Sequence, residues 1–108
     1  MKHGWFKMNR AIFTDEILCY NSEYLAVWCY LCANAAFKAR QARFAGELIT
    51  LQPGQLITGR KVIAEATKLS ESKVQRILAF FEKAKRISQV TSTKHRLISI
   101  LEPEYPES

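Results

Sequence analysis

The apolar positions of this chain first indicate two helices. Residues 23–37 carry no acidic or basic side chain between Glu23 and Lys38, and their apolar residues recur at steps of three and four. This period predicts a buried helix, with Ser22 as its N-cap. Residues 10–20 have the pattern of a shorter helix that breaks near Thr14 and Asp15.

Strand-like runs follow this helical part. Residues 47–51 and 55–58 are apolar runs on either side of Pro53 and Gly54. Proline fixes φ and glycine tolerates a positive φ, so the pair predicts a hairpin or a tight turn that leads into the next helix.

Helical period returns after Thr58. Residues 59–68 place Val62, Ile63 and Ala66 on one face of a short helix, and a turn at Lys68–Leu69 ends it. Ser70 is then the expected cap of a second helix, whose core-facing stripe is formed by Val74, Ile77, Leu78 and Phe81. The opposite face carries Ser72, Lys73, Gln75, Arg76, Ala79 and Lys83.

Two side chains near the end of this helix carry separate expectations. Phe80 lies off the apolar stripe, so we expect it to pack on the first helices or on a second subunit. Lys85 stands near the expected end of this helix, at a position where glycine is common, and its side chain predicts that the helix continues past it without a left-handed cap. After Arg86 the period falls to two, and residues 87–93 and 96–102 predict a second hairpin around Thr93–His95.

Charge is concentrated on the same part of the chain. Residues 59–96 contain ten Lys or Arg against three Glu, a local charge of +7, whereas residues 1–58 contain six against four. The total of +6 permits an acidic partner such as nucleic acid, and its position favours the second helix and its flanks.

The order from residue 58 to 101 is a short helix, a turn, a helix with a basic face, and a hairpin. This order predicts an α+β fold, a winged helix-turn-helix with additional N-terminal helices, over residues 1–101 as a single domain. Residues 102–108 are expected to be a flexible tail or the start of a linker. The base-facing candidates are Lys73, Gln75 and Arg76, because their donors and acceptors match base edges in the major groove. The candidates for contact with DNA phosphates are Ser70, Ser72, Arg60, Lys61, Lys94 and Arg96.

Other functions share this pattern. A basic helical face is more often only a solvated surface. The same fold can also serve as a module for self-association, with Trp5, Phe6 and Phe80 at a subunit interface, or as a small transcription regulator. The expected partners are double-stranded DNA and a second copy of the chain.

Four segments resemble a known family: residues 4–13, 31–38, 49–89 and 92–100. They are similar to the N-terminal winged-helix domain of phage replisome organisers and DnaD-type replication proteins. The most specific pieces are Gly54–Thr58 and Leu97–Ile100. The resemblance implies a DNA-binding or self-assembly module, which in that family usually precedes a second domain that engages DNA and helicase-loading partners. Replication proteins are thus implied as partners through a domain that this sequence lacks.

Enzymatic and metal-binding functions find little support. Cys29 and Cys32 form a C-x-x-C pair, but a structural zinc site usually needs four ligands, so buried, inert thiols are expected. No metal, no cofactor and no catalytic residue is expected. No run has the length and apolarity of a signal-peptide core or a membrane span, which with the odd number of cysteines predicts a cytoplasmic protein with reduced thiols.

Overall fold

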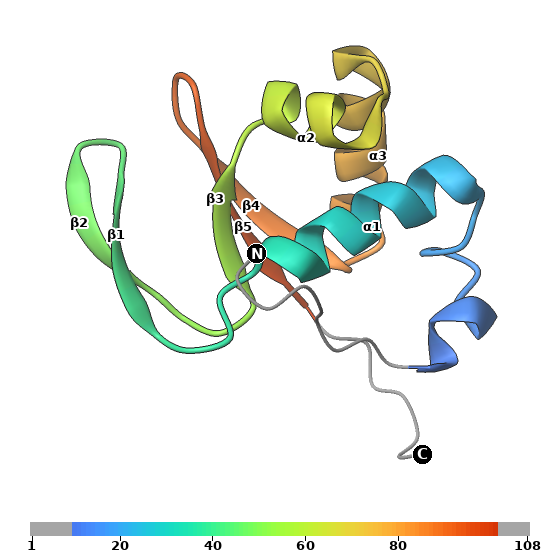
Figure 1. Ribbon diagram of the computed structural model, residues 1–108, viewed down its shortest axis with the longest axis horizontal. Coiled ribbons are helices and arrows are strands. Elements are labelled where there is room, and N and C mark those ends of the chain that lie inside the picture. Colours follow the sequence, from blue (N-terminus) through green and yellow to red (C-terminus); the bar gives the residue numbers. More distant parts are fainter. Residues whose placement is uncertain (1–9, 102–108) are drawn as a thin grey trace.

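The computed structural model describes residues 10–101, which form an α+β fold of three α-helices and two small antiparallel sheets (Figure 1). The tail expected at 102–108, and Trp5 and Phe6 with their expected interface role, lie outside the described residues. The elements are η1, a 3-10 helix (Arg10–Thr14), α1 (Ser22–Asn34), β1 (Arg40–Phe44), β2 (Glu47–Leu51), β3 (Gln55–Thr58), α2 (Arg60–Thr67), α3 (Glu71–Lys83), β4 (Ile87–Thr91) and β5 (Arg96–Ile100).

The first helix begins one residue earlier than predicted. Its N-cap is Asn21, not Ser22, because the Asn21 side chain accepts hydrogen bonds from the backbone N–H groups of Glu23 and Tyr24. This oxygen satisfies two donors that the first turn of a helix cannot pair internally. The predicted break near Thr14 is confirmed, since η1 ends there.

Of the two predictions for the chain around Pro53 and Gly54, the hairpin between residues 47–51 and 55–58 is wrong. β2 does not form a hairpin with β3; it pairs with β1 across a turn at Ala45 and Gly46, both of which have positive φ. The alternative prediction, a tight turn at Pro53–Gly54, is confirmed: Gly54 has φ +87° and the N–H of Gln55 donates to the carbonyl of Gln52. β3 then pairs with β5, which also pairs with β4 in the predicted second hairpin.

Helix α3 buries the predicted stripe. Val74, Ile77, Leu78 and Phe81 are all buried against the other two helices and the three-stranded sheet. The predicted buried face of α2 is confirmed at Ile63 and wrong at Val62 and Ala66: Ile63 and Ala64 are buried, whereas Val62 is 49% exposed and Ala66 is also exposed. Neighbouring residues point about 100° apart around the helix axis. In a short helix the apolar pattern therefore does not decide which of two adjacent residues faces the core.

The end of α3 also corrects a prediction. The helix stops at Lys83, and Lys85 itself adopts the left-handed conformation with φ +62°. The N–H of Arg86 donates to the carbonyl of Phe81, and that of Lys85 to the carbonyl of Glu82, which is the hydrogen-bond pattern of a Schellman cap. Lysine therefore takes the role that glycine usually has.

Side chains from every layer meet in one core. Val27, Trp28 and Leu31 of α1 pack with α2 and α3 and with Leu56, Ile87 and Ile98 of the sheet. The hydroxyls of Tyr30 and Thr58 lie 2.9 Å apart and join α1 to β3. Figure 1 shows the three helices together beside the sheet, while the β1–β2 hairpin projects from the opposite side.

A buried carboxylate joins the segment before α1 to the segment after α3. The Asp15 side chain is 3% exposed and lies 3.3 Å from a guanidinium nitrogen of Arg86. Its Oδ1 also accepts hydrogen bonds from the N–H groups of Ile17 and Leu18. One carboxylate thus shapes a local turn and holds two segments that are 71 positions apart.

We expect Asp15→Ala to lower the free energy of unfolding by about 3 kcal/mol, because it leaves a largely buried guanidinium and two backbone donors without their acceptor. Asp15→Asn, which can still accept from both backbone groups, should cost less. Urea denaturation measures both. The control is Arg60→Ala, which breaks the ion pair of Arg60 with Glu71, both about half exposed, and should cost about 1 kcal/mol or less. Equal losses for Asp15→Ala and Arg60→Ala would contradict this account.

Candidate nucleic-acid interface

The outward face of α3 is defined by what its opposite face buries. Because the apolar stripe points into the core, the exposed residues of the outward face are Ser72, Gln75, Arg76, Ala79 and Lys83. This set contains two cations and no carboxylate. Its hydroxyl, amide and guanidinium groups are those that hydrogen-bond to base edges and phosphates.

The helix start is organised by Ser70, which is the predicted N-cap. Its Oγ accepts a hydrogen bond from the N–H of Lys73 and lies 3.4 Å from the Oγ of Ser72. The prediction that Ser70 caps the helix is thereby confirmed. Its oxygen is already engaged in the cap, while the exposed Ser72 hydroxyl stands at the first turn, where backbone N–H groups and the helix dipole favour anions.

Arg96 connects α3 to the β4–β5 hairpin. One guanidinium nitrogen donates to the side-chain oxygen of Gln75 on α3, and the other to that of Gln89 on β4, both at 3.0 Å. This bridge fixes the hairpin against the helix and occupies the acceptor of Gln75. The amide nitrogen of Gln75 remains available as a donor toward an acceptor outside the protein.

Positive charges gather where the hairpin meets the start of α2. Thr58, the last residue of β3, pairs with Arg96, and Arg60 follows two positions later. Partial burial lowers the pKa of Arg96, and the nearby Arg60 lowers it further, against a smaller opposing effect of Glu82. Arginine keeps its charge at neutral pH, and the repulsion between Arg96 and Arg60 is an effect that a nearby anion would relieve.

The hairpin tip lies next to the same place. A Cβ added at Gly59 would come within 3.2 Å of the backbone oxygen of Lys94, so the tip and the first residue before α2 are in close approach. Lys61 and Lys94 are both exposed. The structure therefore brings Arg60, Arg96 and the hairpin tip with Lys94 into one region, here called the phosphate cluster, and Lys61 follows Arg60 at the start of α2.

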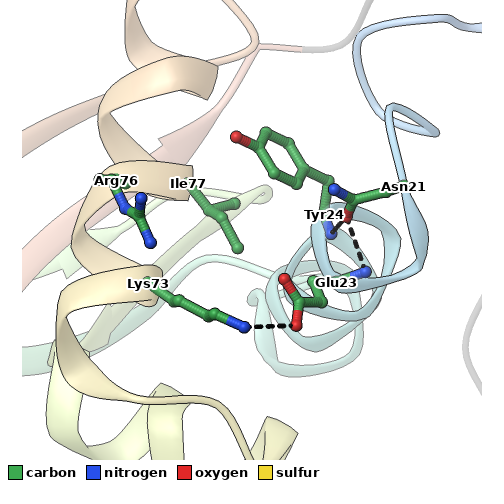
Figure 2. A pocket seen from close by; sticks show the side chains of 6 residues that line it. All are labelled: Asn21, Glu23, Tyr24, Lys73, Arg76 and Ile77. Carbon is green, nitrogen blue, oxygen red and sulfur yellow. Dashed lines mark hydrogen bonds and ion pairs between the residues drawn. The ribbon is translucent and has the colours of Figure 1, made fainter.

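Lys73 is oriented away from this cluster. Its ammonium donates to a carboxylate oxygen of Glu23 at 2.9 Å, across a shallow pocket between α3 and the start of α1 (Figure 2). Arg76 lines the same pocket but makes no hydrogen bond or ion pair with any part of the chain between residues 10 and 101. Sequence periodicity placed Lys73 on the basic face, and only the position of Glu23, fifty residues away, shows that this lysine has a partner within the protein.

Two carboxylates border the outward face, and each has a partner. Glu71 lies 3.4 Å from Arg60, and Glu82 accepts a hydrogen bond from the amide of Gln89 at 3.1 Å. Neither partner is evident from the sequence pattern, because α2 and β4 meet α3 only in the folded chain. These contacts hold both acids at the border of the basic surface.

Aromatic side chains form a second exposed feature. Phe80 packs on Tyr24 and Tyr20, with ring centroids 5.1 and 5.7 Å apart, so the prediction that it packs on the first helical region is confirmed. Tyr20 remains 64% exposed, and Phe13, in η1, is 73% exposed. Neither residue stands out in the apolar pattern of the sequence.

Cys19, Cys29 and Cys32 are all only partly buried, which corrects the prediction that the thiols of Cys29 and Cys32 are buried. Burial of the sulfur raises the pKa of Cys19, and the nearby Asp15 raises it further. Burial also raises the pKa of Cys29, with a smaller effect from Cys19. Within residues 10–101 no three His, Cys, Asp or Glu side chains are grouped so as to hold a metal ion.

Comparison with known proteins found no matching family model, no matching curated protein and no matching solved structure. Within the described part of the chain, no helix is both long and apolar enough to cross a membrane.

We expect Cys19 and Cys29 to be alkylated by iodoacetamide more slowly than an unstructured cysteine at pH 7.5, because the folded protein disfavours the reactive thiolate. A raised thiol pKa also means that the folded state holds its proton longer than the unfolded state does. The contribution of each thiol to the stability of the folded state is therefore fully present below the pKa that the thiol has in the unfolded chain. This contribution is lost as pH rises through the raised pKa of the folded state. Peptide mass spectrometry of timed reactions measures the rates. Labelling of both residues at the rate of the urea-unfolded chain would contradict this prediction.

Proposed function

We propose that this chain is a DNA-binding module of the winged helix-turn-helix class, with α3 in the major groove and the β4–β5 hairpin on the phosphate backbone. The observation that carries the proposal is the carboxylate-free outward face of α3 beside the hairpin to which Arg96 joins it. A major groove admits an α-helix, and the flanking cations suit its phosphates. In this arrangement Gln75 and Arg76 face base edges, and Arg60, Lys61, Lys94 and Arg96 face phosphates.

The assignment of Lys73 depends on its ion pair with Glu23. The side chains of the pair are 45% and 38% exposed, so the pair contributes only about 1 kcal/mol or less to stability. A DNA phosphate close to α3 can therefore replace Glu23 as the partner of Lys73, because losing the ion pair costs little free energy. Lys73 therefore acts as a conditional DNA contact, available when DNA replaces Glu23.

A role in replication initiation rests on the resemblance of the sequence to phage replisome organisers. The resemblance supports a role for this chain as a non-catalytic module of a replication protein from a phage or other mobile element. Other replication proteins would be its further partners. A transcription regulator of the same fold would use the same surface. The exposed Phe13 and Tyr20 favour a second candidate function, a protein-interaction module that assembles as a homodimer.

Replacement of Arg76 tests the base-facing role. We expect Arg76→Ala to cost about 1–3 kcal/mol of binding free energy on a preferred duplex, and less on unrelated sequences, because the guanidinium of a groove-facing arginine pairs with guanine. Selection from a random duplex library supplies the preferred sequence, and fluorescence anisotropy measures the affinities. Equal losses on all duplexes would assign Arg76 to the backbone instead.

Replacement of Lys94 tests the contact of the hairpin tip. We expect Lys94→Ala to weaken binding to every duplex alike and to reduce the slope of log K against log salt by about 0.9, which corresponds to one phosphate contact. The matched control is Lys85→Gly, which removes the same charge at the far end of β4, at a residue whose φ of +62° suits glycine. The function itself is contradicted if the chain shows no duplex binding at low salt, or if its binding is indifferent to Arg76 and Lys94.

Replacement of Glu23 tests whether Lys73 is held in reserve. We expect Glu23→Gln to raise duplex affinity up to about fivefold, which corresponds to about 1 kcal/mol, because Lys73 is then released from its carboxylate partner. Lys73→Ala in the Glu23→Gln background should cancel this gain, and the double-mutant cycle isolates the pairwise effect. Glu16→Gln, at an exposed acid outside the pocket, controls for the change in net charge. A gain that persists without Lys73 would show that only overall charge matters.

A further inference from the structure

The β1–β2 hairpin is a separate arm with its two ends held together. The N–H of Ala36 donates to the carbonyl of Gln55, and the N–H of Gly54 donates to the carbonyl of Ala36, at 2.9 and 2.8 Å. The chain thus leaves the body at residue 36 and returns to it at residue 54. Figure 1 shows the arm projecting away from the helices, toward the same edge of the molecule as the tip of the β4–β5 hairpin.

The two faces of the arm differ. Ala42 and Phe44 on β1 and Ile49 on β2 share one face and are half-buried, next to the buried Leu51. Alternate residues of a strand point to opposite faces, so the other face carries the cross-strand pairs Gln41–Thr50 and Arg43–Leu48. All four of these side chains are exposed. We call this set the outer face of the arm.

The chemistry of the outer face fits a polyanion. It presents an amide, a hydroxyl, a guanidinium and one leucine, and it contains no carboxylate. The arm also carries the exposed Lys38 and Arg40 against a single exposed acid, Glu47. Amide, hydroxyl and guanidinium groups are the common donors to phosphate oxygens, and a two-stranded ribbon fits the major groove of B-DNA.

We propose that the outer face of the β1–β2 arm is a second duplex-binding element, with Arg43 on a phosphate and Gln41 and Thr50 hydrogen-bonding to the same backbone. This inference rests on the proposed function. The longest dimension of the whole molecule is 39 Å and one turn of B-DNA is about 34–36 Å, so α3 and the arm both lie within about one turn of a duplex. An isolated two-stranded hairpin is only marginally stable in water, so contact with DNA also orders the arm.

The test compares two arginines on one strand. We expect Arg43→Gln to reduce the slope of log K against log salt by about 0.9, because one phosphate contact is lost. Arg40→Gln removes the same charge three residues away on the opposite face and should leave the slope unchanged. Gln41→Ala combined with Thr50→Ala should weaken binding without changing the slope, since neither side chain is charged. Hydrogen exchange of the arm amides should slow when duplex is added.

The outcomes separate this inference from the proposed function. Duplex binding that depends on Arg76 and Lys94 but not on Arg43 overturns the arm contact and leaves the proposed function intact. Equal effects of Arg43→Gln and Arg40→Gln overturn the assignment of the outer face. A change in molecular mass by light scattering on Arg43→Gln would assign the arm to contact between copies and also overturn it. Absence of any duplex binding by the unmodified chain removes both proposals together.

Discussion

Burial of the apolar stripe of α3 is the constraint on which the proposed interface depends. Val74, Ile77, Leu78 and Phe81 fit between the other helices and the sheet, and none of them is more than 2% exposed. Rotating α3 about its axis would expose several of these side chains, each at a cost of about 1.5–3 kcal/mol. Packing of the core thus fixes the direction in which Gln75 and Arg76 point. The geometry of the proposed interface follows from this packing and does not need contacts among the surface side chains.

Local patterns in the sequence were sufficient for the helices and for the second hairpin. The apolar period located α1, α2 and α3, and Ser70 was correctly identified as the cap of α3, whereas the cap of α1 and part of the buried face of α2 were not. Strand pairing was harder to predict, because Leu48 and Leu56 belong to similar apolar runs, yet Leu48 pairs with Arg43 in the adjacent strand β1 and Leu56 pairs with Ile98 in the distant strand β5. Gly46 is the local sequence signal for the missed turn, since two-residue hairpin turns favour positive φ, which glycine adopts readily and which Ala45 and Gly46 both have in the structure.

The side-chain partners within the candidate site could not be predicted from local sequence. Lys73 meets Glu23, and Arg96 meets Gln75, only after the helices and strands have packed. Lys85 shows a related limit, since a lysine in a left-handed cap costs conformational energy that the two backbone hydrogen bonds of the cap and the burial of Phe81 offset. Sequence periodicity identified the outward face of α3, whereas the availability of each side chain on it follows from tertiary contacts.

The central claim is that α3 is the DNA-binding helix. The most direct test is a titration of the protein with DNA duplex that is monitored by NMR of the backbone amides. The account predicts that the amide resonances of Ser72, Gln75, Arg76 and Ala79, and those of residues 92–96 at the hairpin tip, shift together as duplex is added. Resonances near Phe13 and Tyr20, outside the proposed interface, should move little. Shifts confined to the aromatic residues, or no shifts at any salt concentration, would contradict the assignment of α3 as the DNA-binding helix.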